Sequence, residues 1–109
     1  MTESLRVLIT DDNTTNRKLL RVVLEAENYV VLEADNGLSA LLVLEQEPVD
    51  AVISDILMPE MDGYRLCYEI RKNPKLRRLP FIVYTASYTS PSDEKVAIQF
   101  GVDKFLRKP

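Results

Sequence analysis

Five side chains that can take part in chemistry stand at or just after short apolar runs: Asp11, Asp12, Asp55, Thr85 and Lys108. Apolar runs of this length, bounded by turn-forming residues, predict buried strands. The carboxyl ends of parallel strands open onto the ligand crevice of an α/β sheet, so we expect these side chains to share one edge. Carboxylates gathered at one edge repel one another, and a bound cation would remove that repulsion.

This oxygen-rich set favours Mg²⁺ together with a ligand that carries phosphate. Mg²⁺ is commonly held by one or two carboxylates, waters and substrate phosphate oxygens. Lys108 offers such a phosphate a point charge, and the Thr85 hydroxyl offers a hydrogen bond. Asp55 is the natural nucleophile, because carboxylates form aspartyl phosphates. The residues therefore predict phosphoryl transfer, which needs positioning and charge neutralisation more than acid–base groups.

Length and composition exclude several other classes of protein. A chain of 109 residues predicts one domain, and its net charge of −3 argues against a nucleic-acid surface. The apolar runs are too short to span a bilayer, so we expect no membrane contact. One cysteine excludes an internal disulfide and fits the cytoplasm. The absence of histidine excludes histidine bases, histidine metal ligands and a phosphohistidine carried by this chain.

The hydrophobic pattern predicts five strands that alternate with four helices. The strands are expected at residues 6–10, 29–34, 50–55, 81–85 and 104–107. The helices are expected between residues 13 and 28, 38 and 47, 63 and 73, and 90 and 101. In the first helix, Leu19, Leu20, Val23 and Leu24 keep the spacing of an inner stripe. Such alternation calls for a doubly wound α/β fold: a parallel sheet with helices on both faces.

A basic run follows the third helix. It consists of Arg71, Lys72, Lys75, Arg77 and Arg78. We interpret the run as a solvated loop, and an acidic partner is the alternative interpretation.

In combination, these motifs resemble the two-component response regulator receiver domains, the CheY-like phosphoacceptor family. The resemblance runs from Val7 to Pro109. It rests on Asp11-Asp12, on the stretch Asp-Ile-Leu-Met-Pro-Glu-Met-Asp-Gly from Asp55 to Gly63, on Thr85-Ala86 and on Lys108-Pro109. The resemblance implies a flavodoxin-like sheet of five parallel strands in the order 2-1-3-4-5.

The resemblance also implies a role for each residue. The Mg²⁺ ligands would be Asp11, Asp12, Asp55 and the backbone carbonyl of Leu57. The catalytic residues would be Asp55 as phosphoacceptor, Thr85 as hydrogen-bond donor to the phosphoryl group and Lys108 as its ion-pair partner. Thr85 and Phe105 would form the switch, in which the aromatic ring turns inward when the threonine moves.

A receiver domain of this kind takes a phosphoryl group from the phosphohistidine of a histidine kinase or phosphotransfer domain. The phosphorylated form would then control a partner or an output domain in the same chain, which itself could be a kinase region. The chain would catalyse only its own phosphorylation and dephosphorylation, so it is not expected to be an enzyme in the usual sense. A homodimer remains open.

Two alternative functions remain open. One is a degenerate receiver that serves only as a protein-interaction domain. The other is an aspartyl-phosphate phosphohydrolase, which would need a second acid two residues after the nucleophile, where this chain has Leu57.

The pattern contains no fifth helix, which receiver domains carry at the C-terminus. We therefore expect residues 1–109 to be the N-terminal part of a longer protein. A parallel sheet is apolar on both faces. Without the fifth helix, apolar surface is expected to lie open near Leu5, Val7, Val102 and Leu106.

Overall fold

The computed structural model describes residues 4–86 and 91–108, with the side chains of residues 91–93 left out. Five parallel strands form one sheet in the order β2-β1-β3-β4-β5, which confirms the predicted topology. The strands are β1 (Arg6–Thr10), β2 (Val30–Ala34), β3 (Ala51–Ser54), β4 (Phe81–Thr85) and β5 (Lys104–Arg107). In register, Thr10 lies beside Ser54 and Thr85 lies beside Arg107, so these strands end at a common edge.

Four helices connect the strands, as the alternation predicts. They are α1 (Thr14–Ala26), α2 (Gly37–Gln46), α3 (Gly63–Lys72) and α4 (Pro91–Gln99). Asn13, Asn36 and Asp62 cap the first three, each accepting a hydrogen bond from the backbone N–H three residues further on. These caps satisfy N–H groups that have no partner inside the helix, and they fix where each helix begins.

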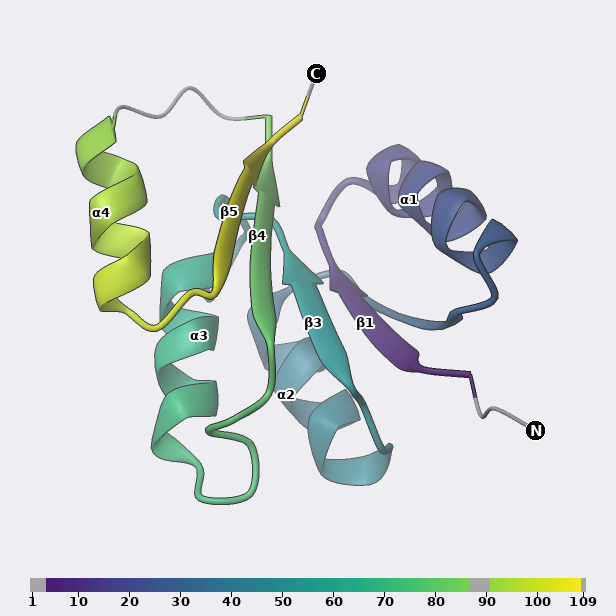
Figure 1. The fold of residues 1–109 in the computed structure, drawn as a ribbon, viewed down its shortest axis with the longest axis horizontal. Coiled ribbons are helices and arrows are strands. Elements are labelled where there is room, and N and C mark those ends of the chain that lie inside the picture. Colours follow the sequence, from purple (N-terminus) through teal and green to yellow (C-terminus); the bar gives the residue numbers. More distant parts are fainter. Residues whose placement is uncertain (1–3, 87–90, 109) are drawn as a thin grey trace.

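The main core lies between the sheet and the layer formed by α2, α3 and α4 (Figure 1). Alternate strand residues point into it because side chains along a strand alternate between the two faces. The core residues that the strands contribute are Leu8, Ala34, Val52, Phe81 and Val83, and the helices add Ala40, Leu44, Leu66, Cys67, Ile70 and Ala97. Helix α1 lies apart from the other three helices (Figure 1).

Helix α1 buries much less of its apolar stripe than the sequence pattern predicts. Leu19 is 64% exposed and Val23 is 60% exposed. Both line a hollow of about 290 Å³ beside the helix, together with Asn16, Leu20, Tyr84 and Lys108. The expectation of an inward-facing stripe is therefore wrong for these two residues, because no described element packs over them.

The apolar surface left open also differs in part from the expected one. Leu5 and Leu106 are exposed, as predicted. Val7 and Val102 are buried, so the prediction is wrong for them. Val7 lies on central strand β1 between β2 and β3, and Val102 packs against the main core just before β5.

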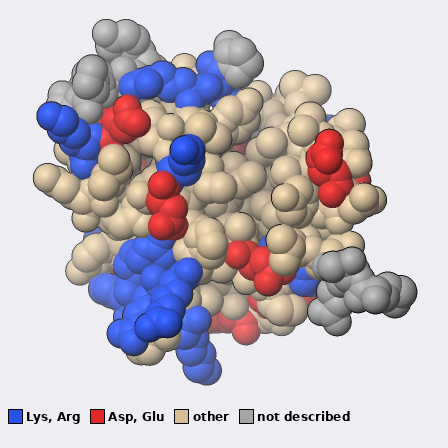
Figure 2. All heavy atoms as spheres, in the orientation of Figure 1, with Lys and Arg blue, Asp and Glu red and all other residues tan. Residues whose placement is uncertain are grey.

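The basic run after the third helix is expected to be a solvated loop, and Arg71 differs from this expectation. Figure 2 shows Lys and Arg side chains gathered at the lower left, over the end of α3 and the loop to β4. Arg71, however, is only partly exposed. Its guanidinium donates hydrogen bonds to the carbonyls of Leu79 and Gly101, at 2.6 and 2.7 Å, and pairs with Asp103 at 2.9 Å. Arg71 thus ties α3 to the chain segments that precede β4 and β5.

None of the helices in residues 4–86 and 91–108 combines the length and the hydrophobicity of a membrane-spanning segment.

Candidate functional site

The candidate site lies at the carboxyl edge of the sheet, where β1, β3, β4 and β5 end. Main-chain hydrogen bonds continue past the strand ends. The Asp55 N–H donates to the Thr10 carbonyl at 2.9 Å, and the Lys108 N–H donates to the Thr85 carbonyl at 2.7 Å. These bonds hold Asp55 and Lys108 at one edge, although 53 positions separate them in the sequence.

The Lys108 ammonium stands between two carboxylates. Its Nζ lies 3.0 Å from Asp11 Oδ2 and 3.6 Å from Asp55 Oδ2. All three side chains are largely buried: 12% of Lys108, 7% of Asp11 and 12% of Asp55 is exposed. The Nζ also lies 5.4 Å from the centroid of the Tyr84 ring, within the range of a cation–π contact. The ends of β1 and β3 and the residue after β5 are thus joined by one charge cluster.

Hydrogen bonds from the backbone orient both carboxylates. Asp11 Oδ1 accepts from the Asn13 N–H at 2.9 Å, and Asp55 Oδ1 accepts from the Ile56 N–H at 2.7 Å. The Asp12 side chain is exposed, and the Leu57 side chain is 63% exposed in the loop after β3. Asp12 and Leu57 are therefore both accessible to solvent.

The two predicted switch residues lie on adjacent strands. Thr85 is fully buried at the end of β4. Phe105 on β5 is partly buried, pairs in register with Val83 and packs against the main core. The Arg107 guanidinium lies 5.5 Å from the centroid of the Phe105 ring. The threonine and the ring are thus offset by two positions along neighbouring strands.

Gly63, at the start of α3, shapes the backbone of the site. A Cβ atom at this position would lie 2.3 Å from the carbonyl oxygen of Asp55, which is closer than real Cβ contacts come. The Gly63 N–H donates to the Ile56 carbonyl at 2.8 Å. The start of α3 therefore packs directly on the backbone of Asp55. The only sequence signal is a glycine directly after the Asp62 helix cap.

The donor set fits a magnesium ion. No three of the Asp, Glu and Cys side chains in residues 4–86 and 94–108 form a ready-made metal cluster. Mg²⁺ does not require one, because it usually keeps several waters and takes one or two carboxylates. Asp11 and Asp55 are two carboxylates that already share the Lys108 ammonium, and Asp12, next to Asp11 in the sequence, is exposed to solvent. The chemistry of this edge is therefore compatible with a hard divalent cation.

Comparison with known proteins gives a consistent result. The family model described as the response regulator receiver domain matches residues 7–109. An uncharacterised 14.6 kDa protein of Leptolyngbya boryana is 41% identical over 103 residues, which are 94% of this chain and 78% of that protein. The sensor histidine kinase CheAY of Helicobacter pylori is 37% identical over 105 residues, but this chain covers only 13% of its length.

A solved structure extends the comparison to three dimensions. The receiver domain of the sensor histidine kinase PA1611 from Pseudomonas aeruginosa superposes with a TM-score of 0.87 at 30% identity. The match covers 98% of this chain and 87% of that one, whose structure has a magnesium ion coordinated in its active-site cleft. The sequence match, the sheet order and this likeness agree, and the chain belongs to the response regulator receiver domain family of two-component signalling.

Proposed function

We propose that this chain is a phosphorelay receiver that accepts a phosphoryl group on Asp55. The observation that carries the proposal is the shared contact of Lys108 with Asp11 and Asp55. A lysine that neutralises a largely buried carboxylate is well placed to pair with a phosphoryl group on that carboxylate. The family membership supports the same assignment.

Asp11, Asp12, Asp55 and the Leu57 carbonyl would hold the magnesium ion in this proposal. When bound, the ion neutralises negative charge on the transferred phosphoryl group. The chain's own residues supply the rest. Asp55 presents its carboxylate oxygen on a rigid strand end, the Lys108 ammonium offsets charge on the phosphoryl oxygens, and the Thr85 hydroxyl donates a hydrogen bond to one of them.

The proposed transfer exchanges one bond to phosphorus for another. An Asp55 carboxylate oxygen forms a bond to the phosphorus atom while the P–N bond of the donor phosphohistidine breaks. The imidazole nitrogen leaves with the bonding electron pair. The reverse of activation is hydrolysis: water attacks the phosphorus, inorganic phosphate leaves and the Asp55 carboxylate is restored.

Phosphorylation would act through the loop after β3 and through Thr85 at the end of β4. Lys108 cannot keep both of its carboxylate contacts unchanged when Asp55 carries a phosphoryl group, so the charge cluster must rearrange. The Thr85–Phe105 pair would transmit this change to the face formed by α4 and β5, which a partner or an output domain reads. The phosphoryl donor would be a histidine kinase or a phosphotransfer domain.

The test is incubation with acetyl phosphate and Mg²⁺, followed by intact mass spectrometry. We expect one phosphate adduct that does not form in excess EDTA and is absent from Asp55→Asn. An adduct that persists in Asp55→Asn, or that forms equally well in EDTA, would overturn the assignment. A protein that stays unmodified by acetyl phosphate and by several phosphohistidine donors would favour the degenerate receiver.

A further inference from the structure

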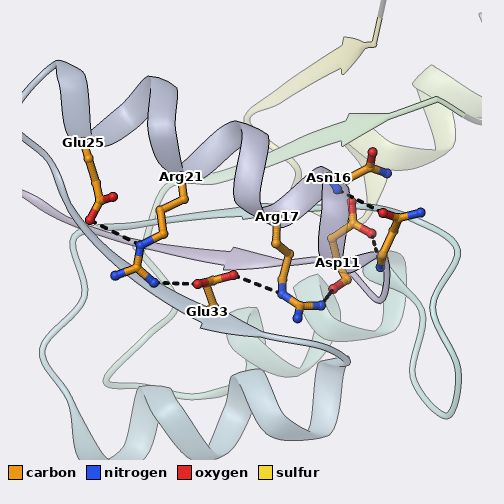
Figure 3. Close-up of polar contacts among 7 residues, drawn as sticks. Asp11, Asn16, Arg17, Arg21, Glu25 and Glu33 are labelled. Carbon is orange, nitrogen blue, oxygen red and sulfur yellow. Dashed lines mark hydrogen bonds and ion pairs between the residues drawn. The ribbon is translucent and has the colours of Figure 1, made fainter.

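Arg17 joins three parts of the fold behind the candidate site. Its Nη1 donates a hydrogen bond to the backbone carbonyl of Asp11 at 2.6 Å, and its Nε donates to Glu33 Oε1 at 3.1 Å. Only 16% of the Arg17 side chain is exposed. One guanidinium group thus links α1, the turn after β1 and strand β2 (Figure 3).

Glu33 is itself held from the other side. Its Oε2 accepts a hydrogen bond from Arg21 Nη1 at 2.5 Å, and Arg21 Nε pairs with Glu25 at 3.2 Å. The dashed lines in Figure 3 follow this chain of contacts from Glu25 through Arg21, Glu33 and Arg17 to Asp11. Because both oxygens of Glu33 are engaged, the position of the Arg17 guanidinium is fixed by β2 as well as by its own helix.

The backbone of Asp11 is held by hydrogen bonds to other parts of the fold, and its carboxylate takes part in the site. Its N–H donates to the Ala34 carbonyl at 3.2 Å, and its carbonyl accepts from Arg17. Its carboxylate points to the other partners, the Asn13 N–H and Lys108 Nζ. When the charge in the site changes, the Asp11 carboxylate can therefore take other hydrogen-bond partners while the backbone of Asp11 stays in place.

We propose that Arg17 is a positioning residue that holds the Asp11-Asp12 turn in the geometry that cation binding and phosphorylation require. The expected effect on cation binding and phosphorylation rests on the proposed function. The hydrogen bond from Arg17 to the Asp11 carbonyl is independent of that function. Functional groups must be held to within about 0.5 Å, and losing a residue that orients metal ligands typically costs roughly 10–100-fold in metal affinity or activity.

The chain supplies a matched pair of variants. Arg17→Gln removes one contact to Glu33 and the contact to Asp11. Arg21→Gln removes the other contact to Glu33 and the pair with Glu25, and it leaves the contact to Asp11 in place. Each variant loses one positive charge on α1, so a difference between them at the site reports the Asp11 contact. Unfolding midpoints of both variants show whether either has lost the fold.

The first measurement is amide hydrogen exchange at Asn13 in the metal-free protein. The Asn13 N–H is bonded to the Asp11 carboxylate, so its protection reports the orientation of that side chain without any cation. We expect faster exchange at Asn13 in Arg17→Gln and wild-type exchange in Arg21→Gln. Equal protection in both variants would overturn the positioning role, whether or not the protein binds metal.

The second measurement is a titration with Mn²⁺ followed by electron paramagnetic resonance. We expect Arg17→Gln to weaken Mn²⁺ binding by roughly tenfold or more, and Arg21→Gln to stay within about twofold of wild type. Equal affinities of the two variants would also overturn the inference. If the wild-type protein itself does not bind Mn²⁺, the proposed metal site fails, and the exchange at Asn13 still decides the role of Arg17.

Discussion

At the residue scale, one ammonium group stands between two carboxylates at the centre of the site. Lys108 Nζ is closer to Asp11 than to Asp55, at 3.0 Å against 3.6 Å. A charge-assisted contact of this kind is strong when it is shielded from water. Lys108 therefore offsets part of the negative charge of Asp11 and Asp55, and it lies within reach of both carboxylates.

Leu57 is the residue that we expect to set the lifetime of the phosphoryl group. Its exposed apolar side chain offers no hydrogen bond to a water molecule beside Asp55. Leu57→Asn should speed the loss of phosphate by roughly tenfold, the effect of one hydrogen bond of about 1.4 kcal/mol in the transition state. The decay of phospho-Asp55 by intact mass tests this, with Leu57→Met as the control. An unchanged or slower decay in Leu57→Asn would show that water is oriented by other groups.

At the element scale, the helix starts place the backbone of the site. Helices α2 and α3 both begin with a glycine that follows a capping Asn or Asp. A Cβ at Gly37 would meet the flexible side chain of Met61 at 2.8 Å, whereas a Cβ at Gly63 would meet the rigid backbone of Asp55 at 2.3 Å. The two positions are alike in secondary structure, but different groups lie opposite them.

This contrast predicts different costs for the same substitution. Gly63→Ala should lower the free energy of unfolding by about 1–3 kcal/mol and slow phosphorylation, because the Asp55 backbone must move. Gly37→Ala should cost less than about 1 kcal/mol and leave phosphorylation unchanged, since Met61 can shift. Urea unfolding and the acetyl phosphate assay measure both effects. Equal behaviour of the two variants would show that the close approach at Gly63 does not constrain the site.

The ion pairs between α1 and β2 predict part of the acid sensitivity. Burial raises the pKa of the Glu33 carboxyl, but the hydrogen bonds from Arg21 and Arg17 outweigh it and lower that pKa below the ordinary value of 4.5. A carboxyl with a lower pKa in the folded state stabilises the fold above its unfolded pKa, and the contribution is lost as the pH falls through the folded pKa.

Glu33→Gln should therefore destabilise the protein more at about pH 7 than at about pH 3. Urea unfolding midpoints of the wild-type protein and of Glu33→Gln, compared at pH values from about 3 to about 7, measure the difference. A difference that stays constant with pH would show that the carboxylate form of Glu33 contributes nothing to stability.

Much of the fold could be predicted because its signals are local. The strands predicted at 6–10, 81–85 and 104–107 match β1, β4 and β5 residue for residue, since polar or turn-forming residues mark the ends of each strand. The gathering of Asp11, Asp55 and Lys108 followed from the parallel strand ends. Non-local contacts could not be predicted in this way. Arg17 and Arg71 look like surface cations in the sequence, and only the fold brings distant carbonyls to their guanidinium groups.

On the scale of the whole molecule, the two faces of the sheet are covered unequally. Helices α2, α3 and α4 form a layer over one face, whereas α1 leaves an apolar hollow of about 290 Å³ beside Leu19 and Val23. A parallel sheet is normally covered by helices on both sides. We propose that a further helix, from outside residues 1–109, packs over this hollow.

Extending the chain by roughly fifteen to twenty residues of its natural sequence, about one helix with its loop, should raise the unfolding midpoint. It should also reduce self-association, because apolar surface on α1 becomes covered. Thermal unfolding and sedimentation velocity compare the two forms. A 109-residue chain that is monomeric and as stable as the extended form would show that the additional helix is not needed.

The central claim is that Asp55 carries the phosphoryl group, and borohydride trapping tests it most directly. Borohydride reduces an aspartyl phosphate to homoserine, which peptide mapping locates in the sequence. After phosphorylation in Mg²⁺, we predict homoserine at position 55 and unmodified aspartate at Asp11 and Asp12. Homoserine at position 11 or 12, or a phosphate adduct that yields no homoserine at position 55, would contradict the account.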